Sequence, residues 1–233
     1  MTQLKSKVSK KIKFLLDEYL PPVIRDQPWF YKPIIRIWNK KMDPDFKRKA
    51  FYFDDQQFQE EYEKIVPMRN TDMTPSTVKF VLNNLSGSSI LEVGCGNGEM
   101  SILCARRGYV VTATDISGGN LKLLKEKVSR EEIDLNVGFL NVENISYQDK
   151  SFDTTLCLHT IEHVRNLYKS IEELKRVTKN RIIVIVPKQR FFKYTCDYHL
   201  NFFGSSEQLI QAFGIRNSSC ITIDNCLCFT GDL

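Results

Sequence analysis

Two periodicities of apolar residues run along this chain from about residue 74 onward. Short unbroken apolar runs, typical of strands buried on both faces of a parallel sheet, predict strands over 88–93, 109–114, 135–140, 153–158 and 181–186. Apolar residues at helical spacing predict helices over 74–85, 98–107, 118–129, 166–178 and 206–213. Strands and helices that alternate in this way indicate an α/β fold with a doubly wound, mostly parallel sheet.

The chain after residue 214 departs from this alternation. Two apolar runs meet near Asp224 and Asn225, which are residue types that favour tight turns. They predict a hairpin that adds an antiparallel strand to the sheet. Because Cys226 and Cys228 are two residues apart, we expect them on the same face of that strand.

The first third of the chain has a helical pattern without strands. Apolar residues at helical spacing predict helices over 4–20, 33–41 and 54–66, and the pair Pro21 and Pro22 should end the first of them. We therefore predict two domains, a helical appendage over 1–73 and an α/β core over 74–233.

The positive charge of the chain is concentrated at its N-terminal end. Residues 1–50 hold 13 Lys and Arg against 5 Asp and Glu, a net charge of +8, whereas the other 183 residues have a net charge of −3. Three interpretations remain open for this basic segment. It could be a solvated face packed on its own domain, a surface that docks on an anionic membrane, or, third, a nucleic-acid contact.

The overall composition indicates a globular protein outside the membrane interior. Hydrophobic residues make up 42% and charged residues 26% of the chain, and no apolar run approaches the roughly 18–20 residues of a membrane span. The seven cysteines are scattered without paired metal-ligand spacing, as expected of reduced cysteines in a cytoplasmic protein.

A glycine-rich turn joins the first predicted strand of the core to the next helix. Gly94, Gly96 and Gly98 alternate with other residues, which lets the backbone turn tightly and approach a ligand closely. Glu92 lies on the strand just before the turn, and Asp115 ends the second strand. An acid at the end of the second strand is placed to accept hydrogen bonds from ribose hydroxyls.

Three segments together resemble the class I S-adenosylmethionine-dependent methyltransferases. They are ILEVGCGNGEMS, VVTATDIS and SFDTTLCLHTIEHV, the last of which is similar to the methyltransferase-11 and ubiquinone-biosynthesis O-methyltransferase-like group. The resemblance covers about residues 74–230. It implies a Rossmann-like sheet of seven strands and S-adenosyl-L-methionine as the cofactor.

The resemblance also implies a set of cofactor-binding residues. Asp115 would bind the ribose, Ile116 would cover one face of the adenine, and Val142 would offer its backbone N–H to the ring. Asn141 stands where the family usually has Asp, and its side-chain oxygen can still accept a hydrogen bond from the adenine amine. The remaining members of the set lie in or beside the glycine-rich turn or at the end of the fourth strand: Glu92, Gly94, Cys95, Gly96, Gly98 and Leu158.

The three histidines of the chain, His159, His163 and His199, are the candidate catalytic residues. His163 belongs to the Glu-His-Val turn of the family and would shape the cofactor pocket. His159 or His199 could instead remove a proton from the acceptor. Small-RNA 3′-end methyltransferases bind a metal with a pattern resembling His159, Glu162, His163 and His199, but they have Glu where His159 stands, so we predict no metal. An inverted zinc-protease motif is rejected, because His159 ends a strand.

The segment 187–203 combines aromatic and basic residues after the fifth strand. It could form an acceptor pocket with a cationic rim, or pack on the sheet as a connector. We predict that residues 1–50 cover this acceptor rim. The expected function is methyl transfer to an oxygen or nitrogen atom of a small-molecule or glycan-type acceptor. The alternatives are an RNA methyltransferase and a cofactor-binding scaffold without catalysis.

Overall fold

The computed structural model describes residues 19–38, 43, 45–64, 73–191 and 198–233. The chain divides into two compact units. The helical unit comprises Met1–Tyr52 and Phe191–His199, and the sheet unit comprises Phe53–Arg190 and Leu200–Leu233. The helix expected over 4–20 lies almost entirely outside the described residues.

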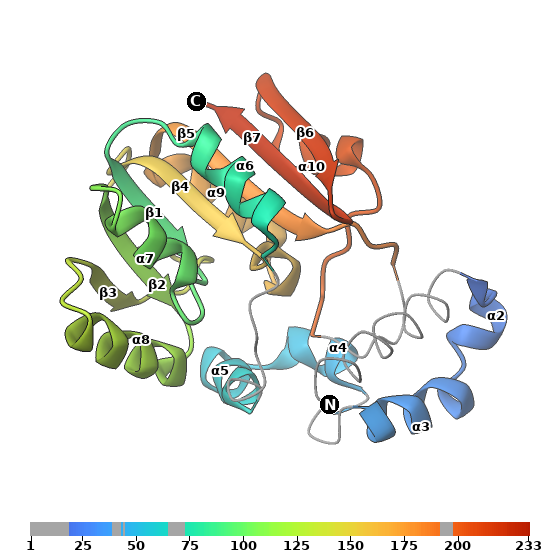
Figure 1. Ribbon diagram of the computed structural model, residues 1–233. Coiled ribbons are helices and arrows are strands. Elements are labelled where there is room, and N and C mark those ends of the chain that lie inside the picture. The colour runs from blue at the N-terminus through green and yellow to red at the C-terminus, as the bar shows by residue number, and fades with distance from the viewer. Residues whose placement is uncertain (1–18, 39–42, 44, 65–72, 192–197) are drawn as a thin grey trace. The chain divides into compact units, whose positions relative to one another are not determined.

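The sheet unit is built on seven strands in the order β3-β2-β1-β4-β5-β7-β6 (Figure 1). The first five are parallel to one another, and β7 runs antiparallel to both β5 and β6. Their bounds are β1 Ser89–Val93, β2 Val110–Asp115, β3 Asn136–Phe139, β4 Phe152–Leu158, β5 Thr178–Pro187, β6 Asn217–Ile223 and β7 Cys226–Asp232. The predicted Rossmann-like sheet of seven strands is confirmed.

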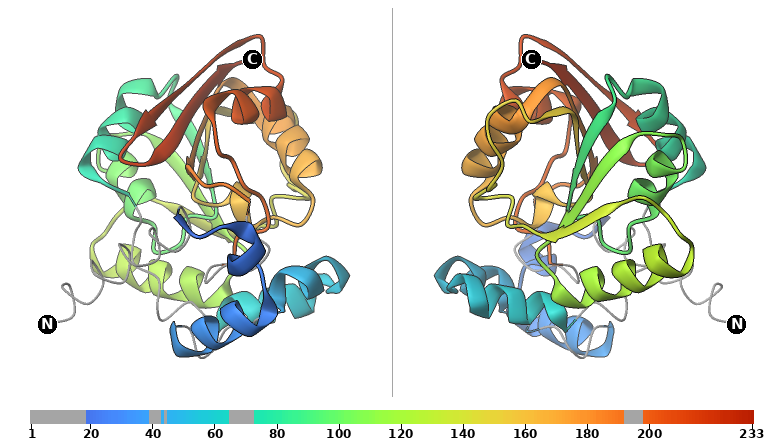
Figure 2. Two further views of the ribbon diagram at one scale, coloured as in Figure 1. Left: turned by 90° about the vertical axis from the view of Figure 1, so that its right-hand side faces the viewer. Right: turned by 90° about the vertical axis from the view of Figure 1, so that its left-hand side faces the viewer.

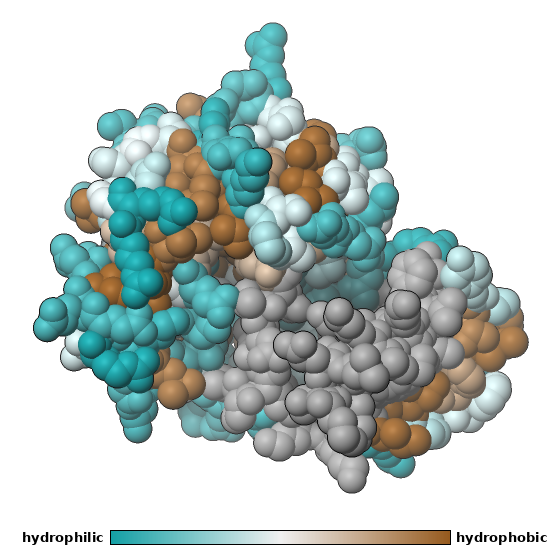
Figure 3. All heavy atoms as spheres, in the orientation of Figure 1, coloured by the Kyte–Doolittle hydropathy of each residue, from teal (hydrophilic) through white to brown (hydrophobic). Residues whose placement is uncertain are grey.

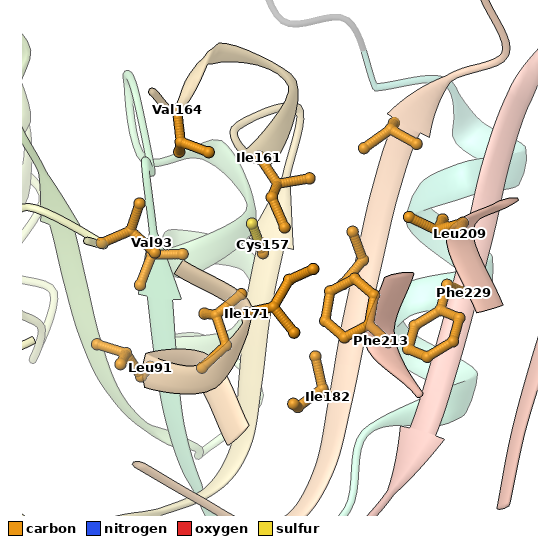
Figure 4. Close-up of a cluster of buried hydrophobic side chains, with 14 of the residues drawn as sticks. Leu91, Val93, Cys157, Ile161, Val164, Ile171, Ile182, Leu209, Phe213 and Phe229 are labelled. Atoms are coloured by element: carbon orange, nitrogen blue, oxygen red, sulfur yellow. The ribbon is translucent and has the colours of Figure 1, made fainter. Parts of the chain in front are cut away.

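Helices cover both faces of this sheet (Figure 2). One face packs against α6 Pro75–Asn84, α7 Glu99–Ala105 and α8 Gly118–Arg130. The other packs against α9 Leu167–Val177 and α10 Ser206–Phe213. Figure 4 shows the second of these cores, in which side chains of β1, β4 and β5 meet those of α9, α10 and β7.

Local signals explain where several elements begin and end. Thr74 forms a capping box with Thr77 ahead of Pro75, as the sequence predicts for the start of α6. Asp224 and Asn225 both have positive φ and connect β6 to β7, which confirms the predicted hairpin. By contrast, α9 passes directly into β5 at Thr178, so the short connection expected between 178 and 181 does not exist.

The helical unit contains α2 Pro22–Arg25, α3 Pro28–Trp38, α4 Phe46–Lys49 and the short 3-10 helix η1 Ala50–Tyr52. The helix predicted over 33–41 in fact begins five residues earlier, with Pro33 inside it. Tyr31 and Ile35 lie one helical turn apart and are fully buried, and this burial outweighs the unfavourable interior proline. The four-residue helices α2 and α4 are too short to show a periodicity in the sequence.

Among the described residues, no helix is both long enough and apolar enough to cross a bilayer. All six described cysteines are free thiols, and five of them are buried. Cys226 and Cys228 share one core cluster, whereas Leu227 between them packs on the opposite face. The predicted alternation of this strand is therefore confirmed.

Candidate functional site

A pocket opens at the carboxyl ends of β1, β2, β3 and β4, within the sheet unit. Its walls combine residues of the turns after these strands with two aromatic residues from α5 Asp55–Glu63. The lining residues are Phe58, Tyr62, Gly94, Asp115, Ile116, Leu140, Asn141, Val142, Glu143, His159, Thr160, His163 and Val164. Ligands of parallel α/β sheets bind at this edge.

The turn after β1 lies directly against the turn after β4. Gly94 has a φ of +67°, and a Cβ added there would lie 2.2 Å from Oγ1 of Thr160. The Thr160 hydroxyl lies within donating distance of the carbonyl oxygens at the ends of both strands, those of Val93 at 3.2 Å and Leu158 at 3.1 Å. Glycine at 94 therefore serves the close approach of two strand ends, besides its left-handed conformation.

Asp115 is held between this turn and the start of α8. Its Oδ2 accepts a hydrogen bond from the N–H of Gly96 at 2.8 Å, and its Oδ1 accepts one from the N–H of Ser117 at 2.8 Å. The side chain is almost fully buried yet lines the pocket. Oδ2 also accepts a longer hydrogen bond from Nδ2 of Asn120 at 3.5 Å. Oδ1 keeps a second lone pair, so Asp115 can still accept a hydrogen bond from a ligand hydroxyl.

Glu92 lies behind the pocket as a buried carboxyl group. Its side chain is 3% exposed and accepts a hydrogen bond from the hydroxyl of Ser101. Burial raises the pKa of Glu92 to about 7, against the opposing effect of the Ser101 hydrogen bonds, and the nearby Asp115 carboxylate adds to the rise. Near neutral pH the group is thus easily protonated.

One wall of the pocket is apolar. Ile116, Leu140 and Val142 form it, at the ends of β2 and β3. Asn141 also lines the pocket, but its Oδ1 accepts the backbone N–H of Glu143 at 2.9 Å. This wall suits the flat face of a heteroaromatic ring.

Five of the residues predicted to bind the cofactor do not line the pocket. They are Glu92, Cys95, Gly96, Gly98 and Leu158. All five lie behind the pocket, either at the end of a strand or in the glycine-rich turn after β1. Their roles stay predictions.

The pocket wall formed by α5 is the main feature that sequence reasoning missed. Asp54 and Gln57 form a capping box at its start, and Phe58 and Tyr62, four residues apart, are buried on one face with ring centroids 5.0 Å apart. Their shared face was visible in the sequence pattern. The residues against which this face packs could not be predicted, because they are distant from α5 in the sequence.

Arg165 binds the start of α5. Its Nη1 donates to the carbonyl oxygen of Phe53 at 2.6 Å, its Nη2 pairs with the carboxylate of Asp55, and its Cζ lies 4.7 Å from the ring centroid of Phe58. The N–H of Arg165 also donates to Oε1 of Glu143 at 2.8 Å. One arginine thus combines charge-assisted hydrogen bonds with a cation–π contact.

The last residue of α5 is bound as well. Oε1 of Glu63 accepts a hydrogen bond from the N–H of Gly119 at 3.3 Å, in the first turn of α8, where free N–H groups attract a carboxylate. Both ends of α5 are therefore attached to elements that carry the pocket.

His159 is partly buried beside a carboxylate. Its φ is +51°, its N–H donates to the carbonyl oxygen of Ile185 at 2.8 Å, and its Nδ1 lies 3.5 Å from Oε1 of the buried Glu162. Burial lowers the pKa of His159, but interactions with Cys226 and with the Glu162 carboxylate outweigh it, and the net effect raises that pKa. A protonated imidazole donates hydrogen bonds and cannot accept a proton.

The other two histidines differ in location. His163 ends the 3-10 helix η3 Ile161–His163, lines the pocket, and meets the ring of Tyr62 edge-on at a centroid distance of 5.7 Å. His199 belongs to the helical unit. A metal site that includes His199 would span both units and remains a hypothesis from the sequence.

The central part of the chain matches a known protein family. Residues 91–186 match the family model described as "Methyltransferase domain". A ubiquinone biosynthesis O-methyltransferase of Rickettsia typhi is 31% identical over 109 residues, which are 47% of this chain and 44% of that protein. A protein of the same name from Coxiella burnetii is 26% identical over 122 residues, which are 52% and 49% of the two chains. The chain thus spans less than half the length of these relatives.

Solved structures share the fold. A SAM-dependent methyltransferase of Aquifex aeolicus superposes with a TM-score of 0.54 at 20% identity, covering 77% of this chain and 97% of that one. The [4+2]-cyclase SpnF gives a TM-score of 0.59 at 16% identity, covering 72% and 73%. Identities this low show a common fold alone.

Glu92 should make the stability of the unliganded protein depend on pH. Its folded-state pKa of about 7 exceeds the ordinary value of 4.5, so the folded state holds an extra proton between these values and the free energy of unfolding falls as the pH rises from 4.5 to 7. Glu92→Gln should remove this loss. Between pH 4.5 and pH 8 the free energy of unfolding of the wild type, measured with urea, should fall by about 2–4 kcal/mol more than that of the variant. If the free energy of unfolding changed equally with pH in the wild type and in Glu92→Gln, the prediction would be wrong. The exposed Glu99→Gln is the control.

Arg165→Ala should loosen α5. Losing its hydrogen bonds to Phe53 and Asp55 removes about 1.5–3 kcal/mol of charge-assisted bonding. Amide hydrogen exchange in 55–63 should therefore accelerate about tenfold to a hundredfold. Arg106→Ala, which breaks the exposed ion pair with Glu131, should leave exchange in α5 unchanged. Equal exchange in wild type and Arg165→Ala would show that α5 is held by other contacts.

Proposed function

We propose that this chain, which contains a class I S-adenosylmethionine-dependent methyltransferase domain, transfers a methyl group to an oxygen or nitrogen atom of a small-molecule acceptor. The observation that carries the proposal is the single pocket that joins Gly94, Asp115, Ile116 and His163. These residues come from three motifs that are far apart in the sequence.

The residues present fit the cofactor. The Cβ position of Gly96 has no atom within 4 Å, so the backbone of the turn is open to a ligand. Asp115 would accept hydrogen bonds from the ribose hydroxyls, and Ile116 and Val142 would enclose the adenine. Glu92 behind the turn would attract the positively charged methionine end of the cofactor. That positive charge would in turn favour the ionised form of the Glu92 carboxyl group.

The protein's part in the reaction is alignment and exclusion of water. The bound cofactor would supply a methyl group activated by a positively charged sulfur. Transfer to a lone pair of the acceptor would leave the electron pair of the broken carbon–sulfur bond on sulfur. Phe58 and Tyr62 of α5 cover the pocket with aromatic surface, which would keep water out and hold the acceptor in line.

Among the predicted catalytic histidines, His163 is best placed to take the acceptor's proton. It lines the pocket beside Tyr62. His159 also lines the pocket, but its pairing with Glu162 favours the protonated form, so we assign it a positioning role. His199, in the helical unit, remains a third candidate.

The relatives support oxygen as the methylated atom, because the curated relatives reported above are named as O-methyltransferases. Glycan-type acceptors and RNA remain alternatives. A similar fold in a protein named as a cyclase shows why the reaction itself needs a test, since a fold does not determine its chemistry.

Asp115→Ala should weaken binding of S-adenosylmethionine. Loss of the charge-assisted ribose hydrogen bonds should reduce the binding free energy by about 1–3 kcal/mol, which titration calorimetry measures as a five- to 150-fold higher Kd. The exposed Asp134→Ala should not change the affinity. Tighter binding of a nicotinamide dinucleotide by the wild type would overturn the cofactor assignment.

His163→Gln should lower transfer while leaving cofactor affinity close to that of the wild type. Label from the methyl group of the cofactor, offered to metabolite and RNA fractions, should enter a small molecule with the wild-type protein. The variant should transfer about 10²–10⁴-fold more slowly because the proton acceptor is lost. The exposed Tyr168→Phe is the control.

Other outcomes separate the alternatives. Label in RNA would favour the RNA methyltransferase. Cofactor binding without transfer to any fraction would favour the scaffold. Wild-type rates in His163→Gln would remove His163 from the chemistry.

A further inference from the structure

The helix α3 is apolar on two opposite sides. Tyr31 and Ile35 are buried on one side. On the other side Trp29, Pro33 and Ile37 follow one another at intervals of four residues, so they form a single stripe. Trp29 is 68% exposed and Ile37 is 76% exposed. Within the part of the chain that the structure describes, this stripe is therefore mostly uncovered apolar surface.

The preceding helix α2 adds to the exposed apolar residues of the helical unit. Val23 is 71% exposed and Ile24 is 39% exposed. We define Val23, Ile24, Trp29, Pro33 and Ile37 as the α2–α3 apolar face. Figure 3 shows hydrophobic surface along these two helices. Contiguous exposed apolar surface of this kind marks an interaction site.

Basic residues outnumber acidic ones in the described segment that carries this face, with Arg25, Lys32 and Arg36 against Asp26. Lys32 and Arg36 are the only charged residues of α3, and Arg36 is exposed. Lys32 pairs with Asp45 at 3.0 Å. The same part of the chain, residues 1–50, has a net charge of +8, against −3 for all other residues. The partner of the α2–α3 apolar face should therefore have negatively charged groups at its surface and apolar material below them.

We propose that the α2–α3 apolar face docks on the surface of an anionic lipid bilayer, with Trp29 and Ile37 entering the boundary between headgroups and acyl chains. Amphipathic helices with aromatic residues and cationic neighbours bind in this way, lying in the plane of the interface. The 11 residues of α3 span about 16 Å, about half the hydrocarbon thickness, so the helix lies on the bilayer.

Charge distinguishes this partner from a second copy of the chain. Pairing two such faces would bring two segments of charge +8 together, and their repulsion would oppose association. Anionic headgroups neutralise the same charge. The apolar stripe and the charge excess thus favour the lipid surface. The inference does not depend on methyl transfer, so either proposal can fail alone.

The two tryptophans of the chain, Trp29 and Trp38, allow a direct test. In full-length Trp38→Phe protein, Trp29 is the only tryptophan. Phosphatidylglycerol-containing vesicles should shift its emission to shorter wavelength, and brominated acyl chains should quench it. Pure phosphatidylcholine vesicles should give a much weaker signal, and added salt should reduce binding because it screens the charges.

A matched pair of substitutions locates the binding surface. In the Trp38→Phe background, Ile37→Ser should weaken vesicle binding about tenfold or more, because it removes one buried apolar side chain. Leu123→Ser, at a 57% exposed leucine of α8 in the sheet unit, should bind as the parent does. Circular dichroism confirms that both variants fold.

Four results would overturn the proposal. Trp29 emission unaffected by anionic vesicles would exclude docking through this face. If Ile37→Ser and Leu123→Ser weakened vesicle binding equally, the α2–α3 apolar face would not be the specific binding surface. Dimerisation in sedimentation that Ile37→Ser abolishes, without vesicle binding, would assign the face to a second copy, and a response to RNA alone would assign it to nucleic acid.

Discussion

The site depends on the contact between two turns that are more than sixty residues apart in the sequence. The turn after β1 and the turn after β4 approach so closely that a Cβ at Gly94 would overlap the side chain of Thr160. This contact places the glycine-rich turn, which precedes α7, beside the segment that carries His159 and His163. The pocket exists because adjacent parallel strands end at the same edge and nothing larger than a hydrogen separates their ends.

Three buried carboxyl groups lie in the pocket wall or close behind it. Glu92, Asp115 and Glu162 are each at least 97% buried, and Nδ1 of His159 lies 3.5 Å from the carboxylate of Glu162. Negative charge in a region of low dielectric favours a ligand that carries positive charge. The elevated pKa of Glu92 is the expected response of such a site before the ligand arrives.

Sequence reasoning succeeded where the determining contacts are local. The strand and helix order, the glycine-rich turn and the Asp224–Asn225 hairpin all follow from periodicity or from turn chemistry within a few residues. It failed where distant residues meet. Arg165 and Asp55 are 110 residues apart, and no local pattern relates them, so the role of α5 as a pocket wall was invisible. His159 and Glu162 are only three residues apart, but their proximity depends on the positive φ of His159 and the 3-10 helix that follows, which no local pattern predicts.

The order of the strands has a consequence for how the protein is made. β7 lies between β5 and β6 in the sheet, although β6 precedes it in the chain. Among the described strands β7 is the sole neighbour of β6, so β6 cannot join the sheet until β7 has paired with β5. The buried side chains of Leu227 and Phe229 complete the core only when β7 inserts. Until then β5 has an open edge with unpaired backbone groups, and the nascent chain depends on protection from association at that edge.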